Sequence, residues 1–265
     1  MTAGVPVTKM HGTRNDFLVI DQRTARDSDL REFARHYCER RSGIGADGVL
    51  VIEPSTCADV KMRIINADGS EAETCGNGLR CVARYLDEQG DGGDRTIETL
   101  AGVHSTSVVS RSPEFLVRVS MGTPIIERRD LPFDNAVFVS LGNPHVVLFA
   151  HSLDAVDLEG AAAKLVGARG LEGGANLHVA VQRDAGDLLV RHWERGVGYT
   201  QACGSGAIAC AAAARSRGSV SEVVNVHVPG GLLRVEWDSR GVAYLTGPAE
   251  RVFEVRVEAT VARGV

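Results

Sequence analysis

The chain repeats itself once, and this repeat constrains its fold more than any other feature. Cys75 and Cys203 lie 128 positions apart, and each stands directly before a glycine-rich stretch, CGNG in one case and CGSG in the other. Sixty residues before each cysteine stands an asparagine, Asn15 in RNDF and Asn143 in GNPH. Because these spacings agree, we expect two similar halves, each carrying one cysteine followed by one helix.

Two further echoes follow in the same order. Nine residues before the two cysteines the chain reads NADG at Asn66 and ERGVG at Glu194. The segment 43–52, GIGADGVLVI, resembles 172–181, EGGANLHVAV, with a slip of one residue. One match between short glycine- and asparagine-rich motifs arises easily by chance, but four in one order at nearly one offset do not. An internal duplication is therefore the favoured interpretation.

Strand-like runs dominate the chain, and most follow one another closely, which favours antiparallel pairing. They lie at 17–21, 48–53, 60–66, 115–121, 135–141, 145–150, 177–182, 187–194 and 232–238. Helical patterns lie at 28–40 with Ser28 as the N-cap, 76–89, 155–167 and 204–216. The expected fold class is therefore α+β. We divide it into halves 1–115 and 116–252, with a C-terminal strand, 253–265, completing the first half.

Composition and charge exclude several kinds of partner. The net charge of −5 and the pI near 5.9 give no reason to expect binding to nucleic acid or to an anionic membrane. The N-terminal residues MTAGVPVTKMHG lack the basic start and apolar core of a signal peptide. No apolar stretch approaches the roughly 20 residues that span a bilayer. We therefore expect a cytoplasmic protein whose cysteines are reduced.

Metal, disulfide and dinucleotide sites are not expected. The six cysteines form no CxxC pair, and the eight histidines do not cluster along the sequence. The segment 43–48, GIGADG, matches GxGxxG, but a helical run precedes it and a strand-like run follows, the reverse of the dinucleotide-binding order. We expect a turn or a close backbone approach there. We interpret these histidines as ordinary packing or strand residues: His11, His36, His104, His151, His178, His192 and His227.

Cys75 and Cys203 differ from the other four cysteines because each stands at the start of a helical pattern. A helix N-terminus presents unpaired N–H groups and about half a positive charge, which lower the pKa of a thiol. One such thiol would suit a nucleophilic hydrolase. Two thiols acting on opposite faces of a substrate carbon suit another task, in which one removes a proton and the other returns it. The helix N–H groups would stabilise the charge that builds on the substrate carboxylate.

Longer motifs carry a family resemblance from residue 9 to about residue 210. They are KMHGTRNDFLVID, RRSGIGADGVL, NADGSEAETCGNGLRC, LGNPHVV, GGANL and WERGVGYTQACGSGA. In this order they resemble the diaminopimelate epimerase family. The resemblance implies two pseudo-symmetric α/β halves, each a mostly antiparallel sheet wrapped around a central helix. It also implies a homodimeric isomerase that interconverts LL- and meso-2,6-diaminopimelate for lysine and peptidoglycan synthesis, with neither pyridoxal phosphate nor a metal.

The resemblance also implies the roles of individual residues. It makes Cys75 and Cys203 the proton-transfer groups, with His145 and Glu194 supporting their protonation states. It implies that the substrate is bound by Asn15, Asn66, Gly76, Asn77, Asn143, Asn176, Glu194, Arg195, Gly204 and Ser205. Of these, the residues that follow each cysteine would hold the reacting carboxylate. The guanidinium of Arg195 suits the distal carboxylate because it can bind it through two parallel contacts.

Two positions depart from the family pattern. The second cysteine motif usually reads GET, and here Tyr199 replaces the acid, while Thr74 replaces a methionine before the first cysteine. Tyr199 removes either a charge near one thiol or a structural hydrogen bond. Two alternatives therefore stay open beside the epimerase: a racemase or epimerase of another amino acid on the same scaffold, and a catalytically inactive binding module.

Overall fold

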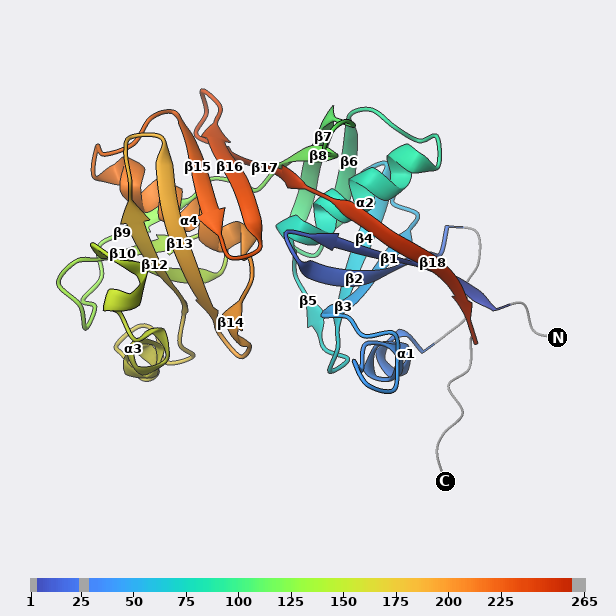
Figure 1. Cartoon of the computed structure of the whole chain (residues 1–265), viewed down its shortest axis with the longest axis horizontal. Coiled ribbons are helices and arrows are strands. Elements are labelled where there is room, and N and C mark those ends of the chain that lie inside the picture. The colour runs from blue at the N-terminus through green and yellow to red at the C-terminus, as the bar shows by residue number, and fades with distance from the viewer. Residues whose placement is uncertain (1–3, 24–28, 259–265) are drawn as a thin grey trace. The chain divides into compact units, whose positions relative to one another are not determined.

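The computed structural model describes residues 4–23 and 29–258, and they form two compact units (Figure 1). Unit 1 comprises Met1–Val119 and Pro248–Val265, and unit 2 comprises Ser120–Gly247. The strand near the C-terminus, β18 (Glu250–Val257), pairs with the first strand of unit 1. Residues 259–265 of the expected C-terminal strand lie outside the described residues.

Each unit contains two helices of at least eight residues among its described residues. Unit 1 contains β1 (Val5–Gly12), β2 (Asn15–Asp21), α1 (Leu30–Tyr37), β3 (Gly48–Glu53), β4 (Val60–Asn66), β5 (Glu71–Ala72), α2 (Gly76–Glu88), β6 (Arg95–Thr99), β7 (Gly102–Ser110), β8 (Leu116–Ser120) and β18. Unit 2 contains β9 (Ile125–Glu127), β10 (Ala136–Ser140), β11 (Pro144–Phe149), η1 (Leu153–Ala155), α3 (Leu158–Leu165), β12 (Asn176–Gln182), β13 (Asp187–Glu194), β14 (Gly198–Thr200), α4 (Gly204–Ser216), β15 (Val223–Val228), β16 (Gly231–Trp237) and β17 (Ala243–Pro248).

The two units repeat one topology. Among the described strands, two pairs in each unit are parallel, β2–β3 and β4–β6 in unit 1 and β11–β12 and β13–β15 in unit 2, while the other described pairings within each unit are antiparallel. Their register also repeats: Phe17 lies opposite Gly48, and His145 opposite Asn176, each 128 positions further on. The expected α+β fold of mostly antiparallel sheets is confirmed, and the sheets are mixed rather than purely antiparallel.

Each sheet surrounds one helix and carries another on its outer face. Helices α2 and α4 have thirteen residues each and contact most strands of their own unit (Figure 1). The sequence of α4, GSGAIACAAAARS, consists mostly of small residues, so strands approach it closely on several sides. Apolar clusters on the outer faces pack against α1 in unit 1 and α3 in unit 2. A central helix within each half is therefore confirmed.

Helix α1 starts one residue later than a Ser28 cap would place it. The side chain of Asp29 accepts hydrogen bonds from the backbone N–H groups of Arg31 and Glu32, so Asp29 is the N-cap. Ser28 itself lies outside the described residues. The GIGADG segment follows α1 as expected of a turn: Gly45 has a φ of 82°, and a Cβ on Gly48 would lie 2.7 Å from the carbonyl oxygen of Ile65.

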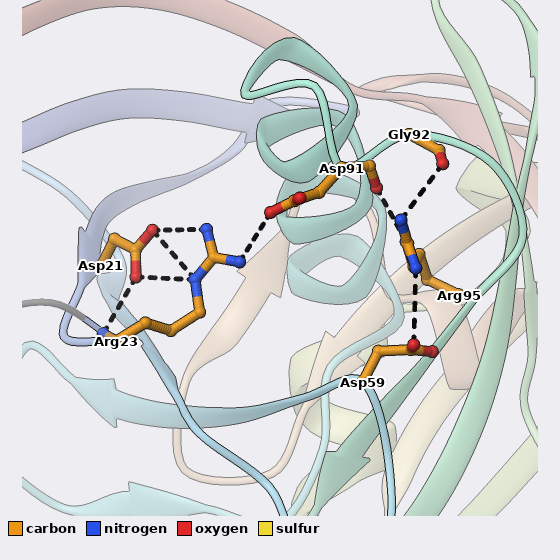
Figure 2. Close-up of polar contacts among 6 residues, drawn as sticks. All are labelled: Asp21, Arg23, Asp59, Asp91, Gly92 and Arg95. Atoms are coloured by element: carbon orange, nitrogen blue, oxygen red, sulfur yellow. Dashed lines mark hydrogen bonds and ion pairs between the residues drawn. The ribbon is translucent and has the colours of Figure 1, made fainter.

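An ionic network fixes the glycine-rich connection that follows α2 (Figure 2). The guanidinium of Arg23 binds both carboxylate oxygens of Asp21 and reaches Asp91 at 2.8 Å. From the other side, Arg95 donates to the backbone oxygen of Asp91 at 2.8 Å and to Asp59 at 3.4 Å. Residues 90–94 therefore form a braced turn inside unit 1. Among the described helices of both units, none is long and apolar enough to cross a membrane.

Candidate active site

Cys75 is the N-cap of α2 and lies beside Asn15. Its thiol Sγ is 3.6 Å from Asn15 Oδ1, and the amide of Asn77 donates to the same oxygen at 3.0 Å. The Nδ2 group of Asn15 donates to a carboxylate oxygen of Asp47 at 2.7 Å. Because a carboxylate only accepts, this bond turns the carbonyl end of the Asn15 amide toward the thiol.

A strained two-residue turn places Asn15 there. Thr13 and Arg14 join β1 to β2 with φ values of 50° and 67°, in the left-handed region that non-glycine residues rarely occupy. Asn15 then begins β2 beside the first turn of α2. Thr13 is buried, and its hydroxyl accepts a hydrogen bond from Arg80 at 3.1 Å, which helps to hold the turn.

A fully buried arginine lies beneath this helix start. The guanidinium of Arg80 donates to neutral oxygens of Thr13, Gly76, Asn77 and Pro248. Burial is the largest cause acting on Arg80 and lowers its pKa to about 10, and negative charge on the sulfur of Cys81 or Cys75 would act in the opposite direction. The side chain therefore stays charged at neutral pH. A positive charge this close favours the thiolate form of Cys75.

Cys203 caps α4 in unit 2, but its surroundings differ. Its Sγ accepts the N–H of Gly206 at 3.4 Å and lies 3.6 Å from the hydroxyl of Ser205. Burial is the largest cause that raises the pKa of Cys203 well above its ordinary value, followed by the charge of Glu194. The bonds from Ser205 and Gly206 oppose this effect but are weaker. The expectation of a lowered pKa at this helix start is therefore wrong for Cys203, which keeps its proton at neutral pH.

Three buried histidines lie in a row beneath α4. His145 Nε2 is 2.9 Å from Asn143 Oδ1, and His145 Nδ1 is 2.9 Å from His178 Nε2. His178 Nδ1 is in turn 2.8 Å from His192 Nδ1. We expected His145 among the site residues, whereas we interpreted His178 and His192 as ordinary packing or strand residues. They occupy neighbouring strands, so only the strand register reveals that the three rings meet.

The other expected site residues lie at strand ends. Asn66 ends β4 and donates to the hydroxyl of Ser70 at 2.9 Å. Asn176 begins β12, donates to the carbonyl of Pro144 at 3.2 Å and accepts the backbone N–H of Arg195 at 3.0 Å. The side chain of Arg195 lines a pocket of about 290 Å³ in unit 2, together with Arg129, Ser140, Gly142, Pro144 and Gly174. The guanidinium of Arg129 binds Glu127 and the carbonyl of Gly170, which leaves Arg195 as the guanidinium of this lining that suits a carboxylate ligand.

Tyr199 lies on the opposite face of the sheet from the histidine row. It pairs across the strands with Trp193, whereas His192 pairs with Thr200. Directly paired residues share a face, and successive residues alternate. The ring of Tyr199 contacts Trp193 at a centroid distance of 4.7 Å and stacks on Arg191. The tyrosine at the usual acidic position therefore packs against the outer face of unit 2.

Gly206 connects the histidine row to the start of α4. A Cβ on Gly206 would lie 2.5 Å from Cε1 of His178, whose ring is hydrogen-bonded on both sides. We expect Gly206→Ala to destabilise unit 2 by about 1–3 kcal/mol, because neither ring nor helix can yield freely. Urea unfolding followed by tryptophan fluorescence measures the loss.

The matched control is Gly78→Ala, at the equivalent position of unit 1. There the added Cβ would meet only the flexible end of Leu50, at 2.9 Å. We expect the smaller loss of stability in this variant, measured by circular dichroism. An equal or larger loss in Gly78→Ala would contradict the special constraint at Gly206.

Solved structures share this fold. The phenazine biosynthesis protein of the PhzF family from Bacillus anthracis has a TM-score of 0.76 and 18% sequence identity, over 96% of this chain and 98% of its own. A probable proline racemase from Agrobacterium radiobacter K84 has a TM-score of 0.70 and 17% identity, over 97% and 93%. The architecture is therefore that of the PhzF and proline racemase structures.

Sequence comparison identifies the family of this chain more specifically than the fold does. The family model described as diaminopimelate epimerase matches residues 7–127 and 137–252. The diaminopimelate epimerase of Caldanaerobacter subterraneus subsp. tengcongensis is 41% identical over 272 residues, covering 95% of this chain and 98% of its own. That of Carboxydothermus hydrogenoformans is 40% identical over 268 residues, covering 93% and 97%. The chain belongs to the diaminopimelate epimerase family.

Proposed function

We propose that this isomerase interconverts LL- and meso-2,6-diaminopimelate by moving a proton between the two faces of one α-carbon. The observation that carries the proposal is the pair of cysteines at equivalent helix starts, in a chain about 40% identical to named diaminopimelate epimerases. Cys75 removes the α-proton, and Cys203 delivers a proton to the opposite face. No atom is gained or lost, and the protonation states of the two thiols are exchanged.

The contrasting surroundings of the two thiols support these roles, with Cys75 as the base and Cys203 as the acid. The buried charge of Arg80 favours a thiolate at Cys75, the form that accepts a proton. Burial and Glu194 keep Cys203 as a thiol, the form that donates one. One base and one acid are thus poised before substrate binds, as a single proton transfer to each face requires.

The carboxylate beside the reacting carbon gains negative charge as the proton leaves. The first turns of α2 and α4 offer backbone N–H groups at Gly76, Asn77, Gly204 and Ser205, which suit that charge. At the distal end of the substrate, the pocket lined by Arg195 suits the second carboxylate. Asn15, Asn66, Asn143 and Asn176 supply further amide groups for the substrate's ammonium and carboxylate ends.

Deuterium exchange tests the proposal directly. Incubating the fully reduced protein with LL-diaminopimelate in D₂O is expected to give meso product that carries deuterium at the inverted α-carbon. The incoming proton comes from a thiol that exchanges with solvent, so product and label should appear together. Chiral chromatography with mass spectrometry measures both. Absence of both product and exchange would exclude the epimerase activity.

The same experiment separates the alternatives. A racemase of another amino acid would leave diaminopimelate unchanged but label a different substrate, whereas a binding module would label none. A substrate without the distal ammonium and carboxylate groups should react poorly if the Arg195 pocket binds that end. We further propose that the enzyme works as a cytoplasmic homodimer in lysine and peptidoglycan precursor synthesis.

A further inference from the structure

The histidine row of unit 2 has an apolar counterpart in unit 1. Positions 128 residues before His145, His178 and His192 hold Phe17, Leu50 and Ile64. All six side chains are buried, and the two sets occupy corresponding strands, β2, β3 and β4 against β11, β12 and β13. Since unit 1 packs the same positions with hydrocarbon, the fold itself does not require imidazoles there. Burying three polar rings costs free energy unless they are hydrogen-bonded, so the row calls for a functional reason.

The protonation of the row follows from its surroundings. Burial is the largest cause that lowers the pKa of His145 and His192 to about 3, and that of His178 well below its ordinary value. The charge of Arg195 lowers the pKa of His145 further. Each ring is therefore neutral at neutral pH and has one donor and one acceptor nitrogen.

The direction of the hydrogen bonds along the histidine row follows from the ring nitrogen at the His192 end of the row. Within the described part of the chain, His192 Nε2 is buried without a partner. An orphaned buried N–H is rarer than an orphaned acceptor, so the proton of His192 sits on Nδ1 and is donated to His178. His178 Nε2–H then donates to His145 Nδ1, and His145 Nε2–H donates to Asn143 Oδ1.

We propose that His178 and His192 are positioning residues that fix the tautomer of His145 and thereby turn the amide N–H₂ of Asn143 toward the substrate. This inference rests on the proposed function, in which Asn143 binds diaminopimelate. A donor at this position suits a substrate carboxylate. In unit 1 the equivalent Asn15 is held the other way, with Nδ2 on Asp47 and Oδ1 toward Cys75. The duplicated asparagines thus present opposite ends of their amides.

Packing adds a second constraint on the row. The ring of His178 lies directly against Gly206, whose N–H binds the sulfur of Cys203. A ring fixed by hydrogen bonds at both nitrogens therefore also supports the first turn of α4. Leu50, the counterpart of His178, has no hydrogen-bonding atoms in its side chain with which to fix a tautomer or an amide.

Nitrogen-15 NMR of histidine-labelled protein tests the tautomers independently of activity. We expect neutral Nε2–H forms for His145 and His178 and a neutral Nδ1–H form for His192, all unchanged between pH 7 and pH 5. Single histidine variants assign the signals. The reverse tautomers, or titration of any of the three rings in this pH range, would overturn the inference even if the enzyme is active.

Kinetics of matched variants test the positioning role. His178→Leu copies the residue that unit 1 uses, and we expect the KM for LL-diaminopimelate to rise by about tenfold or more as the Asn143 amide loses its fixed orientation. His178→Gln keeps an N–H₂ donor for His145, so its KM should remain closer to that of the wild type. His227→Leu, at a half-exposed histidine bound to Asp187, should leave KM unchanged.

Each outcome decides the inference. An unchanged KM in folded His178→Leu, or equal impairment of His178→Gln and His178→Leu, would overturn the hydrogen-bonding role. If His178→Leu does not fold, the Gln variant and the tautomers of the wild-type protein still decide. An inactive wild-type enzyme would defeat the proposed function alone, because the NMR experiment requires no turnover.

Discussion

Replacing Cys75 or Cys203 by alanine is expected to lower epimerisation of LL-diaminopimelate by about 10²- to 10⁴-fold in either variant. Each thiol serves one face of the α-carbon, so the remaining thiol cannot complete an inversion. Both side chains stand at the N-cap of their helices; alanine at Cys75 removes no capping bond, and alanine at Cys203 removes one bond, at 3.4 Å from the N–H of Gly206. Circular dichroism of the product over time measures the rate. Near-normal turnover in either variant would contradict the two-base mechanism.

Cys81→Ala and Cys210→Ala are the matched controls, because each cysteine lies inside the same helix as its counterpart. Both side chains are fully buried, and burial raises the pKa of Cys81 to about 12 and that of Cys210 also above its ordinary value. Neither is therefore a thiolate at neutral pH. We expect turnover within a few-fold of wild type in both controls. This result would show that losing a cysteine from either helix does not by itself abolish epimerisation.

The same variants test whether the thiol of Cys75 becomes reactive at a lower pH than the thiol of Cys203. Cys57 is exposed and would react with any alkylating reagent, so Cys57→Ser provides the background. In that background the Cys203→Ala variant retains Cys75, which we expect to react at a lower pH than Cys203 does in the Cys75→Ala variant. The buried charge of Arg80 and the carboxylate of Glu194 are the causes. The opposite order would reverse the assignment of base and acid.

Sequence reasoning succeeded where local signals agreed with tertiary structure. Helix α4 spans Gly204–Ser216 as expected, because the glycines after Cys203 mark its start and Gly218, with a φ of 69°, follows its end. The two cysteine-helix units and the polar motifs before them were readable for the same reason: glycine and asparagine are needed at fixed turns and strand ends. The duplication then predicted two similar halves.

Several strands were missed because their patterns depend on distant contacts. In β1, Lys9 is buried among apolar residues, and its ion pair with Asp16 at 2.6 Å and its hydrogen bond to the carbonyl of Gly45 make this tolerable. The strand β7, GVHSTSVVS, buries the polar residues His104 and Thr106 and exposes Val103 and Val109, so no alternation of buried apolar and exposed polar residues marks it. The parallel pairing of β2 with β3 requires the crossover through α1, which strand spacing alone does not reveal.

The histidine row shows the limit for the site itself. His145, His178 and His192 are separated by 33 and 14 positions, and no motif joins them. They meet because β11, β12 and β13 are neighbours in one register. Comparison of the two halves offered the one available signal, since the equivalent positions of unit 1 are apolar.

Unit 2 is expected to lose stability steeply below about pH 6.5, because its three buried histidines are neutral when folded. In the unfolded chain a histidine titrates near 6.5, whereas in the fold burial holds the pKa of His145 and His192 at about 3 and lowers that of His178 well below its ordinary value. The unfolded state therefore binds more protons as the pH falls. Stability is full above pH 6.5 and declines toward pH 3, by about 1.4 kcal/mol per pH unit for each histidine.

Urea unfolding followed by tryptophan fluorescence isolates this effect, because both tryptophans, Trp193 and Trp237, lie in unit 2. Three histidines together give a slope of up to about 4 kcal/mol per pH unit in wild type. The variant His178→Leu/His192→Ile takes the residues of unit 1 and keeps one buried imidazole, so its slope should fall to about a third. His227→Leu should leave the slope unchanged, since that histidine is half-exposed and bound to Asp187. Equal slopes for wild type and the double variant would mean that the row is protonated in the folded state. Only histidines that stay neutral in the fold make the stability of unit 2 depend on pH in this way.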